Sequence, residues 1–120
     1  GYDLYAYEGT SILPGQTRLI PTGLSIQPPE GYCFKIYARS GLATKKGLRP
    51  ANCVGICDED YTGEYMVALH NDSNEIQTIE DGERIAQLSL ERYYSFEFEE
   101  VEKLDETERG SGGFGSTGTN

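Results

Sequence analysis

Short apolar runs, each ended by a turn-forming residue, follow one another along most of the chain. Glycine or proline interrupts the sequence every few residues between Gly15 and Gly82. The runs between these breaks are rich in β-forming residues: TRLI (17–20), LSI (24–26), YCFKIYA (32–38), EYMVAL (64–69) and RIAQLSL (84–90). No segment has a long helical period. The pattern predicts an all-β fold, a β-sandwich or barrel of the jelly-roll kind.

The last of these runs alternates like a half-buried strand. Ala86, Leu88 and Leu90 lie on one face, and the aromatic residues at positions 94, 96 and 98 keep the same parity. The acidic stretch 97–108 then predicts a solvated connector that leads to a glycine-rich end. We therefore expect one β-domain over residues 1–108 and a C-terminal arm over residues 109–120.

The arm, RGSGGFGSTGTN, has almost nothing to bury. Glycine loses the most conformational freedom when it is ordered, so fixing this segment in one place is costly. One interpretation is a frayed terminus or linker. The other is a mobile arm that becomes ordered only over a ligand, with Arg109 supplying charge and Phe114 a stacking surface. The arm's residues alone leave both interpretations open.

Acidic residues outnumber basic ones by 20 to 10, which gives a formal net charge of −10. This balance argues against a general binder of nucleic acid or of an anionic membrane. The bases are unevenly spread, because Arg39, Lys45, Lys46 and Arg49 fall within one short window. A local basic site on an acidic protein suits a small anion, and a solvated charged loop is the alternative.

The cysteines indicate whether the protein works in an oxidising or a reducing cellular compartment. Cys33, Cys53 and Cys57 cannot all pair, and they do not form a secreted disulfide framework. With His70, the cysteines lack a full set of zinc ligands at a suitable spacing, so we expect reduced thiols and a histidine at a strand end. No window resembles a membrane span or a signal peptide. These features predict an intracellular protein, cytoplasmic or nuclear.

The candidate chemistry lies in turns. Arg39, Ser40 and Gly41 follow an apolar strand and offer a guanidinium, a hydroxyl and freely oriented backbone N–H groups, the parts of an anion nest. Asp58 follows the run GIC at the tip of an expected hairpin, with Tyr61 three residues later. A carboxylate there can act as a general base on water, or it can belong to an ordinary acidic turn.

Further features concern the neighbours of these turns. Glu59 and Asp60 are expected to raise the proton affinity of Asp58 if they lie near it in space. Gln87 is polar among apolar neighbours in GERIAQL. The tail lacks the Gly-Lys-Ser/Thr of a Walker A loop, which excludes a P-loop ATPase.

Five stretches, taken together and in this order, closely resemble the motifs of the trimeric deoxyuridine triphosphatase (dUTPase) family. They are GYDLYA (1–6), ARSGLA (38–43), GICDEDYTGEY (55–65), GERIAQL (82–88) and RGSGGFGSTG (109–118). The resemblance implies a jelly-roll fold and hydrolysis of dUTP to dUMP and pyrophosphate by attack of water on the α-phosphorus. It also implies that the glycine-rich arm closes over the nucleotide.

The resemblance implies roles on the base and sugar side of the nucleotide. Asp58 matches the catalytic carboxylate that orients and deprotonates the attacking water. Tyr61 matches the ring under the deoxyribose, which leaves no room for a 2′-hydroxyl. Asn52 lies where the family's uracil pocket begins, and Gly55 belongs to the same hairpin, whose backbone groups read the edge of the base.

Other positions match the phosphate side. Ser40 matches the hydroxyl at the α–β bridging region, and Arg39, Gly41 and Gln87 match neighbouring phosphate positions. Asp3 matches a carboxylate that holds Mg²⁺ through its water shell. The matches in the arm are Arg109 with the γ-phosphate clamp, Phe114 with the ring that stacks on uracil, and Gly115, Ser116 and Thr117 with donors around the phosphates.

The resemblance further implies a homotrimer with three shared active sites at subunit interfaces. The Asp58 loop comes from one subunit, the phosphate-binding turns from a second, and the arm from the third. No nucleic acid or membrane is expected as a partner. Two alternatives share the fold: a relative of dCTP deaminase, and a non-catalytic module that senses a nucleotide.

Overall fold

The computed structural model describes residues 1–115, and within them the chain forms nine strands and one short helix. The elements are β1 (Tyr2–Tyr5), β2 (Thr10–Ile12), β3 (Thr17–Ser25), β4 (Tyr32–Ala38), α1 (Ser40–Lys46), β5 (Leu48–Pro50), β6 (Gly55–Cys57), β7 (Glu64–Asn71), β8 (Gln77–Ile79) and β9 (Arg84–Arg92). Every long apolar run of the sequence lies in a strand. The all-β, jelly-roll prediction is confirmed.

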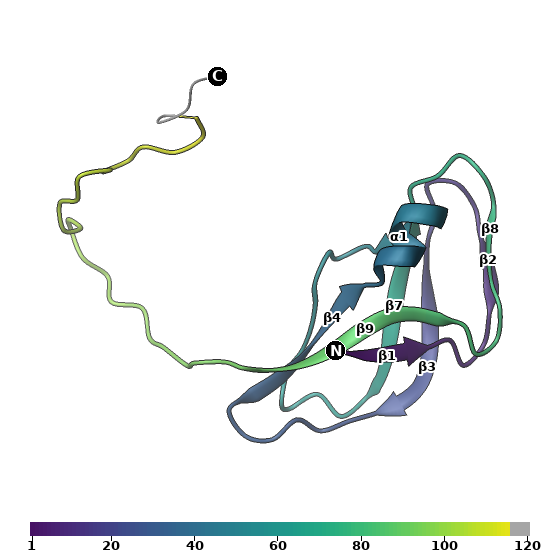
Figure 1. The fold of residues 1–120 in the computed structure, drawn as a ribbon. Coiled ribbons are helices and arrows are strands. Elements are labelled where there is room, and N and C mark those ends of the chain that lie inside the picture. The colour runs from purple at the N-terminus through teal and green to yellow at the C-terminus, as the bar shows by residue number, and fades with distance from the viewer. Residues whose placement is uncertain (116–120) are drawn as a thin grey trace.

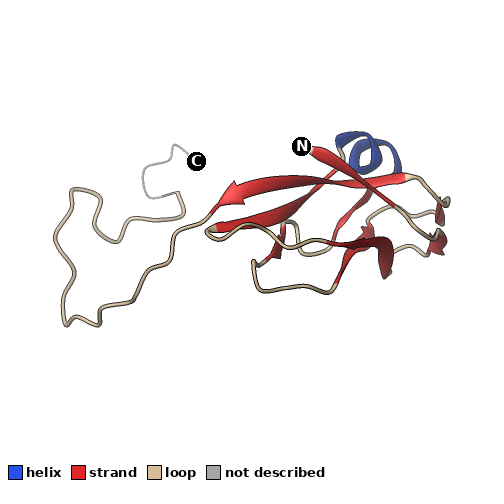
Figure 2. Ribbon diagram, turned by 90° about the horizontal axis from the view of Figure 1, so that it is seen from below, coloured by secondary structure: helices blue, strands red, loops and turns tan. Residues whose placement is uncertain are grey.

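The strands pair antiparallel in three groups. One sheet has the order β1-β9-β4-β6, a second has the order β3-β7-β5, and β2 pairs with β8 at one end of the molecule (Figure 1). The neighbours in each sheet are mostly distant in sequence, as in a jelly roll. Figure 2 shows the strands in two layers, with the C-terminal segment leaving from one end of them.

The core lies between the two larger sheets and is almost entirely aliphatic. Its buried residues are Leu4, Ala6, Ile12, Ile20, Ile36, Leu42, Leu48, Tyr65, Val67, Leu69, Ile79, Ile85, Ala86 and Leu88. In β7 every second side chain is buried, which is the pattern that a strand with one solvated face produces. The core therefore fixes the register of each strand, since a slip of one residue would turn its apolar face outward.

The inward face of β9 ends earlier than its sequence alternation suggests. Ala86 and Leu88 are buried, whereas Leu90 is 47% exposed and the strand ends at Arg92. Phe96 and Phe98 are 74% and 93% exposed in the single chain. The aromatic residues continue the alternation, but no other part of residues 1–115 packs over Phe96 and Phe98.

Two predicted runs join into one strand. TRLI and the first two residues of LSI belong to β3, which contains a register shift against β7 between Pro21 and Ser25. Gly23 lies in this irregularity with a φ of +74°, and a Cβ there would come within 3.0 Å of the Tyr7 ring. Gly23 therefore marks a bulge inside the strand and not the turn that its position in the sequence suggested.

The stretch after β4 is a helix and not the turn that the sequence suggested. Helix α1 has only seven residues, too few to show a helical period. Its Leu42 is buried in the core, and Gly47 ends it in the left-handed conformation with a φ of 68°. The Gly47 N–H donates to the Ala43 carbonyl, so the glycine caps the helix C-terminus.

Beyond Arg92 the chain leaves the sheets (Figures 1 and 2). Residues 93–110 are exposed and contain no helix or strand. The division into a domain and an arm stays a prediction, because an isolated chain does not test where the arm binds. Ser116 and Thr117 lie outside the described residues.

The buried side-chain amide of Asn71 connects several segments at the end of the molecule where β2 pairs with β8. Asn71 is fully buried, and its Nδ2 donates to the Ile12 carbonyl at 2.9 Å and to the Glu75 carbonyl at 2.8 Å. Its Oδ1 accepts from the Ser73 N–H and hydroxyl. All four hydrogen-bonding positions of the amide are used, so Asn71 fixes β2 and the turn after β7 to the core.

Replacing Asn71 by alanine should leave two backbone carbonyls and Ser73 without this partner. We expect the free energy of unfolding to fall by about 3 kcal/mol, because unpaired buried polar groups lose their hydrogen bonds to water as well. Urea unfolding of Asn71→Ala measures it. Asn74→Ala, at an exposed position of the same turn, is the control and should unfold like the wild type. Equal midpoints for all three proteins would contradict this role of Asn71.

Candidate functional site

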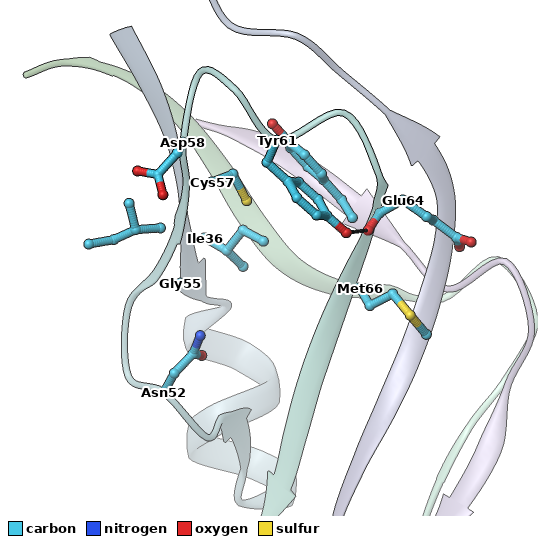
Figure 3. Close-up of a pocket in the computed structure, with 10 residues that line it drawn as sticks. Ile36, Asn52, Gly55, Cys57, Asp58, Tyr61, Glu64 and Met66 are labelled. Carbon is cyan, nitrogen blue, oxygen red and sulfur yellow. Dashed lines mark hydrogen bonds between the residues drawn. The ribbon is translucent and has the colours of Figure 1, made fainter.

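A pocket of about 320 Å³ opens between β6 and β7 (Figure 3). It is lined by Ile36, Asn52, Gly55, Ile56, Cys57, Asp58, Tyr61, Glu64, Tyr65 and Met66. The pocket thus brings together the four base-side and sugar-side residues of the sequence prediction: Asn52, Gly55, Asp58 and Tyr61. The other six lining residues were not predicted, although Ile36 and Tyr65 belong to runs that the sequence marks as strands.

A tight turn forms one wall of this pocket. The Cys53 N–H donates to the Pro50 carbonyl, and the Val54 N–H donates to the Asn52 carbonyl at 2.7 Å. Cys53 has a φ of 64°, a conformation that non-glycine residues rarely adopt. A Cβ at Gly55 would lie 3.2 Å from the Asn52 Nδ2 and 3.3 Å from the Ile36 side chain. Glycine therefore allows the Asn52 amide to lie against β6.

The Tyr61 ring is held from two sides. Its hydroxyl donates to the Glu64 carbonyl at 2.8 Å, and its ring stacks on Tyr65 with centroids 6.1 Å apart and planes 22° apart. A Cβ at Gly63 would come within 2.6 Å of the Tyr61 hydroxyl, so glycine is needed beneath the ring. Tyr61 is still 46% exposed. It presents a fixed aromatic surface to the pocket.

The inner wall of the pocket is uncharged at neutral pH. Burial raises the pKa of the Cys57 thiol above its usual range, against a hydrogen bond to Tyr65 that lowers it. Burial also raises the pKa of Tyr65 to about 12. Asp58 projects from the other side of β6 from Cys57 and is exposed (Figure 3). The site thus has a neutral inner wall and the exposed carboxylate of Asp58 at its edge, while the other lining carboxylate, that of Glu64, accepts from the Gly23 N–H at 3.0 Å.

Asp58 does not lie at a hairpin tip, which corrects the sequence prediction. Strand β6 pairs with β4, whereas β7 pairs with β3 and β5, so the loop of residues 58–63 connects two sheets. Residues 58–61 form a turn in which the Tyr61 N–H donates to the Asp58 carbonyl at 3.1 Å. Adjacent apolar runs suggested local pairing, but the jelly-roll topology places their partners elsewhere in the sequence.

The three consecutive acids of this turn have different surroundings. Asp58 and Asp60 are exposed, whereas Glu59 is half-buried. Glu59 accepts hydrogen bonds from the Tyr93 hydroxyl at 2.5 Å and from the Gly31 N–H at 2.8 Å. These bonds, the Tyr93 hydroxyl first, lower the pKa of Glu59. Its carboxylate is therefore bonded to the ends of β4 and β9 and does not line the pocket.

A second group of polar residues lies where β1, β9 and the end of β4 meet. Asp3 is opposite Gln87 in the β1–β9 register, and the Gln87 Nε2 donates to the Ala38 carbonyl at 3.2 Å. Asp3 accepts from the Arg39 Nε at 3.2 Å and lies 3.7 Å from the Arg84 Nε. Predicted residues from both ends of the chain therefore meet here.

This second group continues onto helix α1 as a basic pocket. Arg39, Lys45, Lys46 and Arg84 line it, with Glu83 as the acid among them. Glu83 lies 3.6 Å from the Lys46 Nζ. Ser40 and Gly41 begin the helix beside these cations. The excess of positive charge over Asp3 and Glu83 suits an anion.

Arg49 is separate from this basic pocket, although the sequence places it in the same window. It forms an ion pair with Asp72, with Nε–Oδ2 at 2.6 Å, on the other sheet. His70 lies near the end of β7 as expected, and its Nδ1 is 2.8 Å from the Thr17 hydroxyl. Arg84, in contrast, joins the basic pocket and was not singled out. Its place in GERIAQL, three residues before Gln87, was the signal for it.

Residues 109–115, the described part of the arm, lie away from the sheets (Figures 1 and 2). None of them lines either pocket. Arg109 donates to the Gly112 carbonyl, a contact within the arm, and Phe114 and Gly115 are both exposed. Within residues 1–115 no group of three or more histidine, cysteine or acidic residues could hold a metal ion. The cysteines there are unpaired, and no helix in that range is long and apolar enough to cross a membrane.

Comparisons with known proteins identify the family of this chain and agree with its fold. A family model described as dUTPase matches residues 1–118. Deoxyuridine 5′-triphosphate nucleotidohydrolase of Finegoldia magna is 51% identical over 120 residues, covering 98% of this chain and 84% of the relative. The enzyme of the same name from Nautilia profundicola is 48% identical over 118 residues, covering 98% and 83%.

Solved structures give the same result. The dUTPase of Staphylococcus bacteriophage 80alpha with dUpNHpp superimposes with a TM-score of 0.85 at 28% identity, covering 99% of this chain and 86% of that one. The dUTPase of Streptococcus mutans superimposes with a TM-score of 0.77 at 31% identity, covering 82% and 81%. The chain belongs to the dUTPase family.

The bonds of Glu59 give a pH prediction. The pKa of Glu59 in the folded protein is below the ordinary value of 4.5. The hydrogen bonds of Glu59 therefore contribute their full stabilisation to the folded protein only above pH 4.5. It is lost as the pH falls through the folded pKa. We expect the unfolding free energy of the wild type to drop more between pH 7 and pH 3 than that of Glu59→Gln, measured in urea. Asp60→Asn, at the exposed neighbouring acid, should follow the wild type. Parallel profiles for wild type and Glu59→Gln would refute the shift.

Proposed function

We propose that this protein is a dUTP diphosphatase that hydrolyses dUTP to dUMP and pyrophosphate with the help of Mg²⁺. Membership of the dUTPase family supports the reaction. The observation that carries the proposal is the pocket in which the fixed ring of Tyr61 and the exposed carboxylate of Asp58 lie together. It provides a platform for a nucleoside and a base for water at one opening.

The pocket suits the uracil and deoxyribose. Asn52 and the backbone at Gly55 line this pocket and offer donors and acceptors for the edge of a pyrimidine, beside the neutral side chains of Cys57 and Tyr65. A mismatched base leaves such groups unpaired, which costs more than a lost apolar contact. The Tyr61 ring packs under the sugar. Because its hydroxyl is bonded to the Glu64 carbonyl, the ring cannot easily yield to a 2′-hydroxyl.

Asp58 acts as the general base. Its carboxylate accepts a proton from a water molecule, which attacks the α-phosphorus, and pyrophosphate leaves with the electrons of the bond between the α-phosphorus and the bridging oxygen. Phosphoryl transfer depends mainly on positioning and on stabilising charge. The rigid turn of residues 58–61 supplies the positioning in this proposal.

The basic pocket at α1 receives the phosphates. Arg39, Gly41 and Gln87 bind phosphate oxygens, and Ser40 donates to the leaving pyrophosphate. Asp3 is the carboxylate nearest to these groups, and it is shared between Arg39 and Arg84. A single carboxylate fits a metal whose other ligands are phosphates and water. When bound, Mg²⁺ would neutralise phosphate charge, with Asp3 holding it through water.

We propose a homotrimer because the parts of this site do not meet within the described residues of one chain. The pocket at Asp58 and the basic pocket have separate linings, and residues 109–115 of the arm line neither of them. In the trimer each site combines the Asp58 pocket of one subunit, the basic pocket of a second and the arm of a third. Arg109 then binds the γ-phosphate, Phe114 stacks on uracil, and Gly115 with Ser116 and Thr117 donates to phosphates.

The substrate is tested by pyrophosphate release from dUTP, dCTP, dTTP and UTP in the presence of Mg²⁺. We expect rapid release from dUTP alone, and a loss on the order of 10²- to 10⁴-fold in Asp58→Asn, because the amide keeps the shape without the base. Ammonia released from dCTP would support the deaminase alternative. Nucleotide binding without turnover by the wild type would support the sensing alternative. An Asp58→Asn variant as fast as the wild type would refute the assignment of the base.

The shared site predicts complementation between two damaged chains. Deletion of residues 109–120 should leave the melting temperature near that of the full chain, because Phe114 buries nothing in the protomer. It should remove most of the activity. A mixture of Asp58→Asn chains with tail-deleted chains, unfolded and refolded together, should regain activity, since some sites receive an intact base and an intact arm. No recovery in mixtures shown by mass to contain mixed trimers would exclude an arm supplied by a neighbour.

A further inference from the structure

Glu59 lies in a closed set of three hydrogen bonds that does not belong to either pocket. It accepts from the Gly31 N–H at 2.8 Å and from the Tyr93 hydroxyl at 2.5 Å. The Tyr93 N–H in turn donates to the Gly31 carbonyl at 3.0 Å. We call Gly31, Glu59 and Tyr93 the loop clamp. Gly31 is 28 residues before Glu59 and Tyr93 is 34 residues after it, so the loop clamp is a tertiary contact.

The loop clamp connects the Asp58 turn to the β4–β9 sheet. Gly31 immediately precedes β4 and Tyr93 immediately follows β9, and these two strand ends are in register as the pair Tyr32 and Arg92. Glu59 follows Asp58 directly and lies inside the turn closed by the Tyr61 N–H. The clamp therefore fixes the backbone from which the Asp58 and Tyr61 side chains project.

The chemistry of the loop clamp suits a rigid hold. Charge-assisted hydrogen bonds to a carboxylate are shorter and stronger than those between neutral groups. Both oxygens of Glu59 are used, one by each donor, so the side chain cannot rotate without breaking a bond. The Tyr93 hydroxyl is protonated at neutral pH, and the hydrogen bond to Glu59 raises its pKa further, to about 12. Asp60, the other neighbour in the turn, is exposed.

The loop clamp also marks the place where the C-terminal segment leaves the barrel. Residues 93–110 are exposed and lie outside any strand, and Tyr93 is the first of them. Its hydroxyl bonds this segment to the body of the domain through Glu59. Tyr93 is bonded to the Asp58 turn through one side chain, Glu59. The start of the arm-bearing segment and the pocket edge are thereby held by the same carboxylate.

We propose that Glu59 is a positioning residue for dUTP hydrolysis. It holds the turn of residues 58–61 so that Asp58 keeps the orientation of a general base, and Tyr93 holds Glu59. The inference rests on the proposed role of Asp58. Glu59 itself contacts neither substrate nor water in this mechanism. Its contribution is geometric, because a misplacement of about 1 Å in a catalytic group is enough to lower turnover strongly.

The first experiment is a double-mutant cycle on the full-length protein with dUTP. Glu59→Ala should lower kcat roughly ten- to a hundredfold. Glu59→Gln should keep most of kcat, because its amide oxygen can accept the Gly31 N–H and its amide nitrogen can donate to the Tyr93 oxygen. In the Asp58→Asn background, Glu59→Ala should lower the residual turnover little further, since the group that it positions is already lost.

The second experiment compares two tyrosine hydroxyls. Tyr93→Phe removes one bond of the loop clamp and should lower kcat several-fold. Tyr37→Phe is the control. The Tyr37 hydroxyl also donates to a carboxylate, that of Glu91, at 2.5 Å. This bond likewise joins β4 to β9, but it lies away from the turn of residues 58–61. Both variants should melt at similar temperatures. Only Tyr93→Phe should change kcat.

The outcomes separate this inference from the proposed function. Equal kcat in wild type and Glu59→Ala, with Asp58→Asn inactive, would overturn the positioning role and leave the general base in place. A loss on Glu59→Ala that is equally large in the Asp58→Asn background would also overturn it, since Glu59 would then act independently of Asp58. A wild type without activity on dUTP would instead refute the proposed function.

Discussion

The position of β4 between β9 and β6 determines where the functional groups lie. On one edge β4 pairs with β9, which brings Tyr37 opposite Gln87; on the other it pairs with β6, which brings Ile36 opposite Gly55. The buried side chain of Ile36 fixes this register, because a slip of one residue would turn it outward. The end of β4 then delivers Arg39 and Ser40, while its partner β6 delivers Asp58. One strand therefore sets the positions of both pockets.

Charge at the basic pocket is balanced without being cancelled. Asp3 contacts two guanidinium groups, Arg39 and Arg84, and so orders them before any anion binds. The pocket still carries more positive than negative charge, because Lys45 and Lys46 add to the two arginines and Glu83 is its only other acid among residues 1–115. An acidic chain with a net charge of −10 repels polyanions at long range. A small basic pocket of this kind can still bind a compact anion, because close, partly desolvated contacts are less screened than distant ones.

The sequence predicts features that depend on local pattern and fails where the contact is distant. Alternation and turn residues predict the strands and the all-β class, and the run GICDEDYTGEY places Asp58 and Tyr61 in one loop. The pairing of β6 with β4 was missed, because the nearest apolar run after the loop is β7. The clamp at Glu59 was missed for the same reason, since nothing near DED indicates Tyr93. Helix α1 was missed because seven residues are too few for a period.

The C-terminal segment leaves aromatic surface uncovered in the single chain. Phe96 and Phe98 stack edge to face at 5.0 Å, yet both are largely exposed in the protomer. Acidic residues alternate with them, so the segment has one apolar and one charged side without a layer of its own chain to cover the first. In the proposed trimer a neighbouring subunit covers that side. The segment then carries the arm to another subunit's site, while Tyr93 keeps its origin fixed beside the Asp58 turn. In that proposed trimer, apolar contacts with the neighbouring subunit would offset the entropy that the extended segment loses when it is ordered.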